Sequence, residues 1–386
     1  MKHQKQHKKN YKAKENNRIK AYKTLYKGEF PESVPFKHRS MCSIEMSFFI
    51  FYLILNSGEI PTDIYNMFNC PPGSFRSVIS DLYHDKLIRR NFDNHLHTYL
   101  LSAKGKKHFN SYCPPYILTS NVLSSRQRHI RLARLNTFLE GLGVSAFLNH
   151  NPDAEDIAIR PELQSRLYFY NAYYLKQNVK YNEKIRRSKA FGVLTGYNKS
   201  FAVYYEPIAR DYYFEEHLFK ETVGNYIGDQ INNMLLVVDN QRQAAVWLRL
   251  LFKYSQFFTG EKLTDYYENA YILVMDSSAR DSLKVIYNER GLARRIALDN
   301  DFDDWNDKLL SCKFEGEKCR FVLSLHIRNV IYLMAHSEYQ ADSHFRIVTT
   351  PYLKPFFDVL FKGKNVSVYY IGDEKWKEYL LQSKTI

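Results

Sequence analysis

Cysteine is scarce in this chain, and no pair of cysteines is spaced for a structural metal site. The five cysteines are Cys42, Cys70, Cys113, Cys312 and Cys319. None of them forms a Cys-x-x-Cys pair, so the sequence predicts neither a zinc site nor a disulfide framework. The expected compartment is the cytoplasm, where thiols stay reduced.

Long apolar runs are absent as well. The most apolar stretch, residues 48–55, is far shorter than the ~20 residues that a membrane-spanning helix needs. The first residues are charged, but they lack the apolar segment and the cleavage site of a signal peptide. We therefore expect no membrane contact, and we interpret residues 48–55 as part of a buried helix.

The usual nucleotide-binding motifs are missing too. The chain contains no Gly-x-x-x-x-Gly-Lys-Ser/Thr loop and no Gly-x-Gly-x-x-Gly turn. Nucleotide hydrolysis and dinucleotide chemistry therefore lack support in the sequence, which predicts no cofactor and no bound metal.

What the chain has is positive charge and aromatic residues. Aromatic residues make up 16% of the chain, which argues against general disorder. The net charge is +14, and residues 1–40 alone hold twelve Lys or Arg against three Glu. This composition predicts a flexible basic arm over residues 1–40 and a polyanionic partner, for which we expect double-stranded DNA.

A series of short elements follows the arm. Residues 41–56 and 61–69 are expected to form two helices, and Ser74 is expected to cap a third that runs to residue 85. The third helix has apolar residues at the i, i+3, i+4 and i+7 positions of one buried stripe, namely Phe75, Val78, Ile79 and Leu82. A strand, a turn and a strand over residues 86–101 and a helix from residue 102 complete the unit. This order predicts a winged helix-turn-helix domain at residues 41–113.

The third helix is the expected recognition helix, because the second helix of a helix-turn-helix pair enters the major groove. Arg76 suits the O6 and N7 atoms of guanine, and serine hydroxyls suit phosphates or either kind of base. Cations on the hairpin and beyond it would neutralise phosphates, which makes binding depend on salt. The predicted DNA-contacting residues are Ser74, Arg76, Ser77, Ser80 and His84 on the helix, Arg89, Arg90, Asn94, His95 and His97 on the hairpin, and Lys104, Lys106 and Lys107 after it.

Two levels of resemblance accompany these patterns. The segment Leu87-Ile-Arg-Arg and the run Thr98-Tyr-Leu-Leu-Ser-Ala-Lys-Gly-Lys-Lys resemble the wing and final helix of prokaryotic winged-helix proteins. The whole chain, with a basic helix at Ser124–Arg131 and the stretches Tyr181–Leu194 and Phe201–Tyr205, resembles the replication-relaxation proteins of plasmids and conjugative elements of Gram-positive bacteria. That resemblance implies a role in plasmid replication or in DNA processing for conjugative transfer, with a relaxase or a replication protein as a further partner. It also implies a C-terminal domain similar to restriction-endonuclease-like folds.

The rest of the chain alternates between predicted strands and helices. Residues 114–154 are expected to be a linker and a connecting helix, and residues 155–386 an α/β domain. The predicted strands are 190–194, 201–205, 235–239, 271–276, 345–349 and 366–371, and the predicted helices are 214–229, 243–254 and 352–361. A hairpin is expected from residues 319–327 and 330–335. The predicted fold class is therefore mixed α/β, an N-terminal winged helix followed by an α/β domain.

The α/β domain offers little for catalysis. A restriction-endonuclease-like site needs an Asp and an acidic-x-Lys pair on a neighbouring strand to hold a divalent ion. The one acidic-x-Lys in the sequence is Asp373-Glu374-Lys375, which is far in sequence from the Pro152-Asp153 pair. We therefore favour a protein without enzymatic activity. A metal-dependent nuclease or relaxase-like enzyme and a transcriptional regulator stay as alternatives, and the oligomeric state, a dimer included, stays open.

Overall fold

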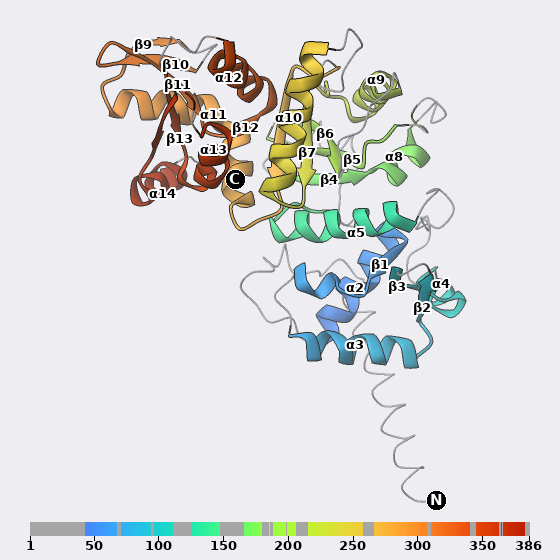
Figure 1. Ribbon diagram of the computed structural model, residues 1–386. Helices are drawn as coiled ribbons and strands as arrows, with labels where there is room; N and C mark the ends of the chain where they lie inside the picture. Colours follow the sequence, from blue (N-terminus) through green and yellow to red (C-terminus); the bar gives the residue numbers. More distant parts are fainter. Residues whose placement is uncertain are drawn as a thin grey trace, which may run out of the picture. The chain divides into compact units, whose positions relative to one another are not determined.

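The computed structural model divides the chain into two compact units (Figure 1). One comprises Met1–Asn151 with Tyr168–Tyr174, and the other comprises Pro152–Leu167 with Leu175–Ile386. The structure describes residues 43–67, 71–93, 96–110, 126–146, 166–179, 185, 188–197, 199–205, 215–257, 266–306, 310–339, 345–362, 364 and 366–382. The predicted arm, residues 1–40, lies outside these ranges. Within them, helices and several sheets confirm the predicted mixed α/β class, and no helix has the length and apolarity to cross a membrane.

The first unit combines helices with a small antiparallel sheet. Its elements are α2 (Ser43–Ser57), β1 (Glu59–Pro61), the 3-10 helix η1 (Ile64–Met67), α3 (Pro72–His84), β2 (Ile88–Asp93), β3 (Leu96–Leu101), α4 (Ala103–Asn110), α5 (Arg126–Gly141), β4 (Tyr168–Asn171) and the start of α8 (Ala172–Asn178). The sheet has the order β1-β3-β2. The sequence does not predict β1, which pairs with β3 and makes the β2–β3 hairpin part of a three-stranded sheet.

The apolar stretch of α2 forms the centre of this unit's core. Every residue from Phe49 to Leu55 is at most 4% exposed, because α3, α5, β1 and β3 all pack around α2. The predicted stripe of α3 is buried in the same core, through Phe75, Val78, Ile79 and Leu82. Burial of each such side chain stabilises the fold by about 1.5–3 kcal/mol. This burial determines which face of α3 points outward.

Helix α5 is a packed part of the first unit. The sequence predicts residues 114–154 as a connection, but α5 contacts α2, β1 and η1. Leu132, Leu135 and Leu139 on α5 are at most 2% exposed, and Ala133 belongs to the core around α2. The unit therefore extends well beyond residue 113.

The second unit contains two sheets, and the strands that it contributes to the first are ordered β12-β8-β7-β6-β5. Strands β6, β7 and β8 are parallel, whereas β5 and β12 run antiparallel to their neighbours. Helix α10 lies against β7 and β8 (Figure 1). The elements are β5 (Gly192–Gly196), β6 (Lys199–Tyr205), α9 (Glu215–Ile227), β7 (Asn233–Val238), α10 (Gln241–Phe257), β8 (Asn269–Val274), α11 (Ala279–Asp299) and β12 (Leu325–His326).

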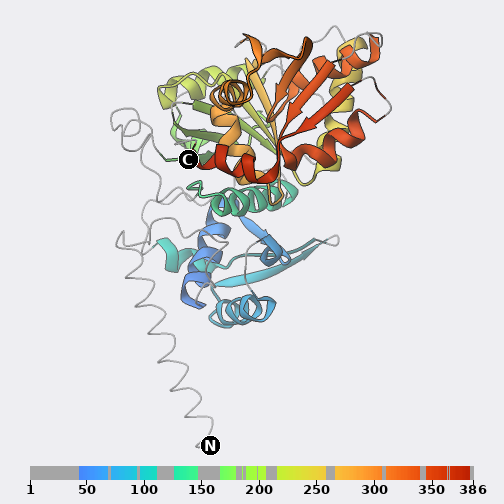
Figure 2. The same ribbon diagram turned by 90° about the vertical axis from the view of Figure 1, so that its left-hand side faces the viewer.

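The second sheet has the order β14-β13-β11-β10-β9, and its strands appear in orange and red in Figure 2. Strands β11, β13 and β14 are parallel to one another, whereas β10 runs antiparallel to both of its neighbours, β9 and β11. Residues of α11 and α14 pack with β10 and β11 in one apolar cluster. The elements are β9 (Asp303–Asn306), β10 (Ser311–Phe314), β11 (Glu317–Val322), α12 (Ile327–Tyr339), β13 (Phe345–Thr349), η6 (Pro351–Leu353), α13 (Lys354–Leu360), β14 (Val366–Tyr370) and α14 (Asp373–Gln382).

The predicted hairpin strand at residues 330–335 is wrong, because this segment belongs to helix α12. Buried residues recur every three positions from Ile327 to Leu333, which is a helical spacing rather than a strand alternation. The expected turn is the first turn of the helix, where the backbone N–H of Asn329 donates to Nδ1 of His326 at 3.3 Å. A side-chain cap of this kind satisfies a backbone donor that has no partner inside the helix.

Candidate nucleic-acid interface

Helix α3 exposes one polar face. The five side chains predicted there to contact DNA are all exposed, namely Ser74, Arg76, Ser77, Ser80 and His84. They alternate with the buried stripe, so the periodicity that buries one face of the helix leaves the other accessible. The predicted cap at Ser74 is wrong, because the helix begins at Pro72, where a missing backbone N–H costs nothing.

The β2–β3 hairpin brings cations next to α3. Arg89 and Arg90 of β2 are exposed as predicted. The Arg90 guanidinium lies 5.2 Å from the ring centre of Tyr83, an exposed residue of α3. This cation–π contact links the hairpin to the end of α3. The other predicted hairpin contacts include Asn94 and His95, which lie outside the described residues.

The remaining predicted contacts have different surroundings. His97 on β3 and Lys107 on α4 are exposed, and Lys106 is half-buried. Nζ of Lys104 donates to the carbonyl oxygen of Asp85 at 2.9 Å. Asp85 follows the last residue of α3, where the helix dipole favours a cation. Lys104 therefore joins α4 to α3 in addition to carrying positive charge.

The Ser-x-x-Gly part of the sequence motif has a structural reason. Oγ of Ser102 accepts the backbone N–H of Gly105 at 2.9 Å and donates to the carbonyl oxygen of Lys86, so it caps the start of α4. Gly105 lies directly against the backbone of Leu87. A Cβ atom at position 105 would lie 2.0 Å from the Leu87 carbonyl oxygen, so this position accepts only glycine without a backbone shift.

We expect Gly105→Ala to lower the free energy of unfolding of the first unit by about 1–3 kcal/mol, the usual cost of forcing an extra carbon into a packed site. Urea denaturation followed by circular dichroism measures this loss. The control is Gly73→Ala in α3, because a Cβ at position 73 meets no atom within 4 Å. That variant should be neutral or slightly stabilising, since alanine has the higher helix propensity. Equal losses in the two variants would show that the contact with Leu87 does not matter.

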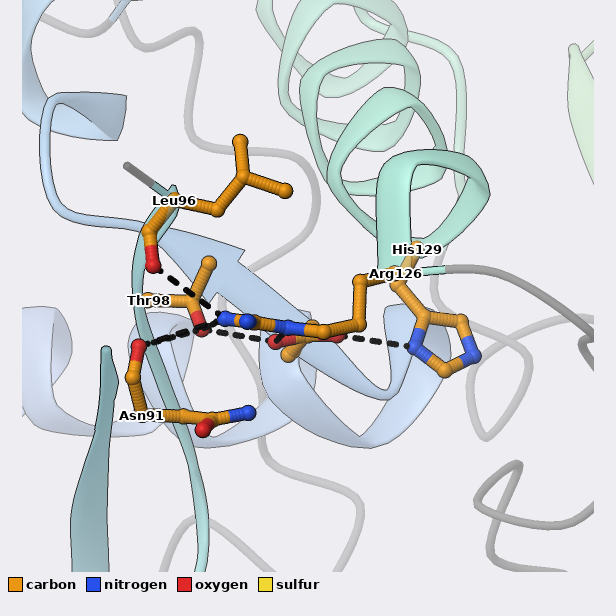
Figure 3. Close-up of polar contacts among 6 residues, drawn as sticks. Asn91, Leu96, Thr98, Arg126 and His129 are labelled. Carbon is orange, nitrogen blue, oxygen red and sulfur yellow. Dashed lines mark hydrogen bonds and ion pairs between the residues drawn. The ribbon is translucent and has the colours of Figure 1, made fainter. Parts of the chain in front are cut away.

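A polar cluster with a buried centre lies on the face of the hairpin that carries Thr98, and we call it the hairpin clasp: Glu59, Thr98, Arg126 and His129 (Figure 3). Glu59 on β1 is 4% exposed. Its carboxylate accepts hydrogen bonds from Oγ1 of Thr98 at 2.6 Å and Nε of Arg126 at 3.2 Å, and lies 3.2 Å from Nδ1 of His129. Burial raises the pKa of Glu59, but these hydrogen bonds and the Arg126 charge outweigh burial, so its pKa lies below its ordinary value.

Arg126 also reaches the backbone of both hairpin strands. Its Nη2 donates to the carbonyl oxygens of Asn91 at 3.2 Å and Leu96 at 3.3 Å, and to Oγ1 of Thr98 at 2.8 Å (Figure 3). Asn91 and Leu96 lie near the turn, on β2 and β3 respectively. One cation from α5 therefore joins the two strands close to the end of the hairpin.

The sequence does not predict the hairpin clasp. Arg126 and His129 are three residues apart, which places them on one face of α5, and this is the single local signal. Their shared partner Glu59 lies some 70 residues earlier. Gly58 completes the fit, because its φ of +89° favours glycine and a Cβ there would lie 3.3 Å from the His129 ring.

The acidic residues considered for catalysis lie in two parts of the chain, of which the structure describes one. Asp373-Glu374-Lys375 begins helix α14 instead of lying on a strand. Nζ of Lys375 donates to Oδ1 of Asn300 at 3.0 Å. Asp153 lies outside the described residues. In the described part of the chain, no group of three His, Cys, Asp or Glu side chains is placed to hold a metal ion.

No family model matches this chain, and no curated protein or solved structure shows significant similarity to it. An assignment of function therefore depends on the sequence and on the geometry of the described residues.

Proposed function

We propose that this protein binds double-stranded DNA through a winged helix formed by the first unit, with α3 in the major groove and the β2–β3 hairpin on the flanking backbone. The observation that carries the proposal is the division of α3 into one buried apolar face and one exposed polar face that includes Arg76. A recognition helix needs both faces, because it reads base edges while it stays anchored in its own domain. The order α2, η1, α3 and hairpin agrees with a helix-turn-helix followed by a wing.

The charge of this region supports the same proposal. Between Pro72 and Asn110 the chain has seven Lys or Arg and three Asp. One of the three, Asp85, is buried. The excess of exposed cations suits a polyanion whose phosphates supply most of the binding energy. The basic arm that precedes α2 in the sequence would add to this attraction.

We expect Arg76→Ala to weaken binding to a specific site by about 1–3 kcal/mol, or roughly 5- to 150-fold, as for the loss of a bidentate contact to guanine. The site itself would come from a pull-down of genomic fragments with the purified protein, followed by sequencing. Gel-shift titration of that site then gives the affinities.

A matched control for Arg76→Ala is Arg249→Ala, which removes an exposed arginine from α10 in the second unit. It changes the net charge equally and should leave the affinity within the error of the titration. Arg76→Lys separates charge from geometry, because lysine keeps the cation but loses the planar fork. Unchanged affinity of Arg76→Ala would remove this residue from the interface.

We also propose that the DNA-binding activity serves plasmid replication or DNA processing for conjugative transfer, in a bacterial mobile element and alongside a relaxase or replication protein. The support is the resemblance of the chain's order, with the basic helix at Ser124–Arg131 and the stretches Tyr181–Leu194 and Phe201–Tyr205, to the replication-relaxation proteins. The sequenced fragments from the pull-down test this role. Fragments near a replication or transfer origin would support it, whereas fragments from scattered promoters would favour a transcriptional regulator.

A further inference from the structure

The hairpin carries an aromatic pair that the fold does not bury. Register and strand alternation place Ile88, Phe92 and their partners on one face of the hairpin. Close to the core this face is buried, as at Ile88. Farther along, Phe92 is 57% exposed. Its ring lies 4.7 Å, centre to centre, from that of the exposed His97 on the opposite strand.

The pair of Phe92 and His97 lies next to a second exposed pair, formed by Arg90 and Tyr83. Arg90 lies two residues before Phe92 on the same face of β2, and its guanidinium covers the ring of Tyr83, which is 49% exposed. We call these four residues the stacking platform: Tyr83, Arg90, Phe92 and His97. An exposed phenylalanine contributes little to folding, because burial is what makes an aromatic side chain stabilising.

We propose that the stacking platform binds unpaired nucleotides beside a duplex, so that the preferred ligand is a junction between double-stranded and single-stranded DNA. The inference rests on the proposed function, since α3 would hold the duplex part. Aromatic side chains stack on any base, and arginine adds contacts with phosphate and ring faces. Inside a duplex the bases cover each other's faces, so a platform of rings finds free base faces where pairing ends.

The hairpin clasp makes this platform rigid. Arg126 binds the carbonyl oxygens of Asn91 and Leu96, which are the chain neighbours of Phe92 and His97. The backbone that carries the two rings is therefore fixed from the opposite face of the hairpin. A ligand that stacks on the pair has less conformational freedom to remove from the protein, which favours binding.

The test compares two fluorescein-labelled DNA probes with the full-length protein: a blunt duplex, and the same duplex with unpaired arms at one end. Fluorescence anisotropy gives both dissociation constants. The wild-type protein should bind the forked probe more tightly. Phe92→Ala should weaken binding to the forked probe by about 5- to 150-fold, the range for loss of one base-stacking ring, and leave the blunt duplex unaffected. Phe92→Trp should retain the preference.

A matched control is Tyr332→Ala on α12, which removes a half-exposed ring beneath Arg320 in the second unit and should leave both constants unchanged. Equal binding of the two probes by the wild-type protein would overturn the platform and leave the proposed function standing. Equal weakening of both probes by Phe92→Ala would overturn it as well, in favour of a ring that wedges into intact duplex. Failure to bind either probe would remove the proposed function itself.

Discussion

Replacement of Glu59 by alanine is expected to lower the free energy of unfolding of the first unit by about 3 kcal/mol. The substitution removes the acceptor shared by Thr98, Arg126 and His129. It leaves the Arg126 cation without its carboxylate, and removing one partner of a buried ion pair typically costs about 3–5 kcal/mol. We take the lower end because the Arg126 side chain is 22% exposed, so water offsets part of the loss.

The positions of the tryptophans allow the two units to be followed separately. All three, Trp247, Trp305 and Trp376, belong to the second unit, so their fluorescence in urea reports that unit. Hydrogen exchange of the amides in α2, β1 and β3, read by mass spectrometry, reports opening of the first unit. Recording both signals distinguishes a loss confined to the hairpin clasp from a general destabilisation.

A surface ion pair made by another arginine of α5, the helix that carries Arg126, provides the control. Nη2 of Arg134 lies 3.2 Å from Oδ2 of Asp63, and the two side chains are 37% and 55% exposed. Asp63→Ala should cost at most about 0.5 kcal/mol, because exposed pairs gain little in water. If Glu59→Ala costs no more than Asp63→Ala, the hairpin clasp does not stabilise the unit.

The stabilisation by Glu59 should also disappear in acid. Its pKa in the folded protein lies below the ordinary value of 4.5. Its contribution is therefore fully present above pH 4.5 and is lost as the pH falls through the folded value. Hydrogen exchange, corrected for the intrinsic rate at each pH, gives the free energy of opening of the first unit. The difference in this free energy between the wild-type protein and Glu59→Ala should narrow as the pH falls below 4.5. A difference that stays constant would mean that the charge of Glu59 contributes nothing.

Local patterns in the sequence predict the parts of the fold that local physics determines. The stripe on α3 is correct because each of its residues needs only the helix itself to reach the same face. The β2–β3 hairpin is correct for the same reason, since its strands are neighbours in the chain. The error at α12 is informative, because Val330–Ala335 is a short, continuously apolar run, and such a run is shared by buried strands and buried helix segments.

Long-range contacts account for what the sequence does not predict. Strand β1 has three residues, and its pairing with β3 joins Ile60 to Tyr99. The hairpin clasp likewise needs β1, β3 and α5 in place before Glu59 and Arg126 meet. Neither arrangement leaves a periodic trace, because β1 is only three residues long and the hairpin clasp takes one or two polar residues from each element. The sequence does not predict the exposure of Phe92 either. Alternation predicts which face of the hairpin carries Phe92, but it does not predict where along that face the core ends.

A substitution at Glu289 is expected to have the second large effect on the free energy of unfolding. Its dependence on pH is opposite to that of Glu59, because the pKa of Glu289 is raised. It lies on α11 beside Asn288, where the helix loses its regular geometry. Its carboxylate accepts the backbone N–H and Oγ–H of Ser324, both at 2.9 Å. Burial raises the pKa of Glu289 to about 7 from an ordinary value of 4.5. The second unit is therefore expected to be more stable by about 3 kcal/mol at pH 4.5 than above pH 7 through this one group, since each unit of pKa corresponds to about 1.4 kcal/mol.

Glu289→Gln should remove that dependence, because the amide keeps an acceptor for Ser324 and never ionises. The variant and the wild-type protein should have similar stability near pH 4.5, and the variant should be more stable by about 3 kcal/mol at pH 8. Urea denaturation followed by tryptophan fluorescence measures both values. The difference between the two proteins is the quantity to use, because burial lowers the pKa of His326 to about 4. That group loses its stabilisation as the pH falls below 6.5, which would mask the effect of Glu289 in the wild-type protein alone.

The exposed Glu268 supplies the matched control for Glu289→Gln. Glu268→Gln makes the same chemical change in water and should alter the stability by less than about 0.5 kcal/mol at every pH. A difference between Glu289→Gln and the wild-type protein that is the same at pH 4.5 and pH 8 would show that Glu289 titrates near its ordinary value. A difference that grows as the pH rises would show that the hydrogen bonds from Ser324 do not compensate for burial of the charge. In that case the kink of α11 is most stable around a protonated carboxyl group, and the second unit loses stability as the pH rises from about 4.5 to 7.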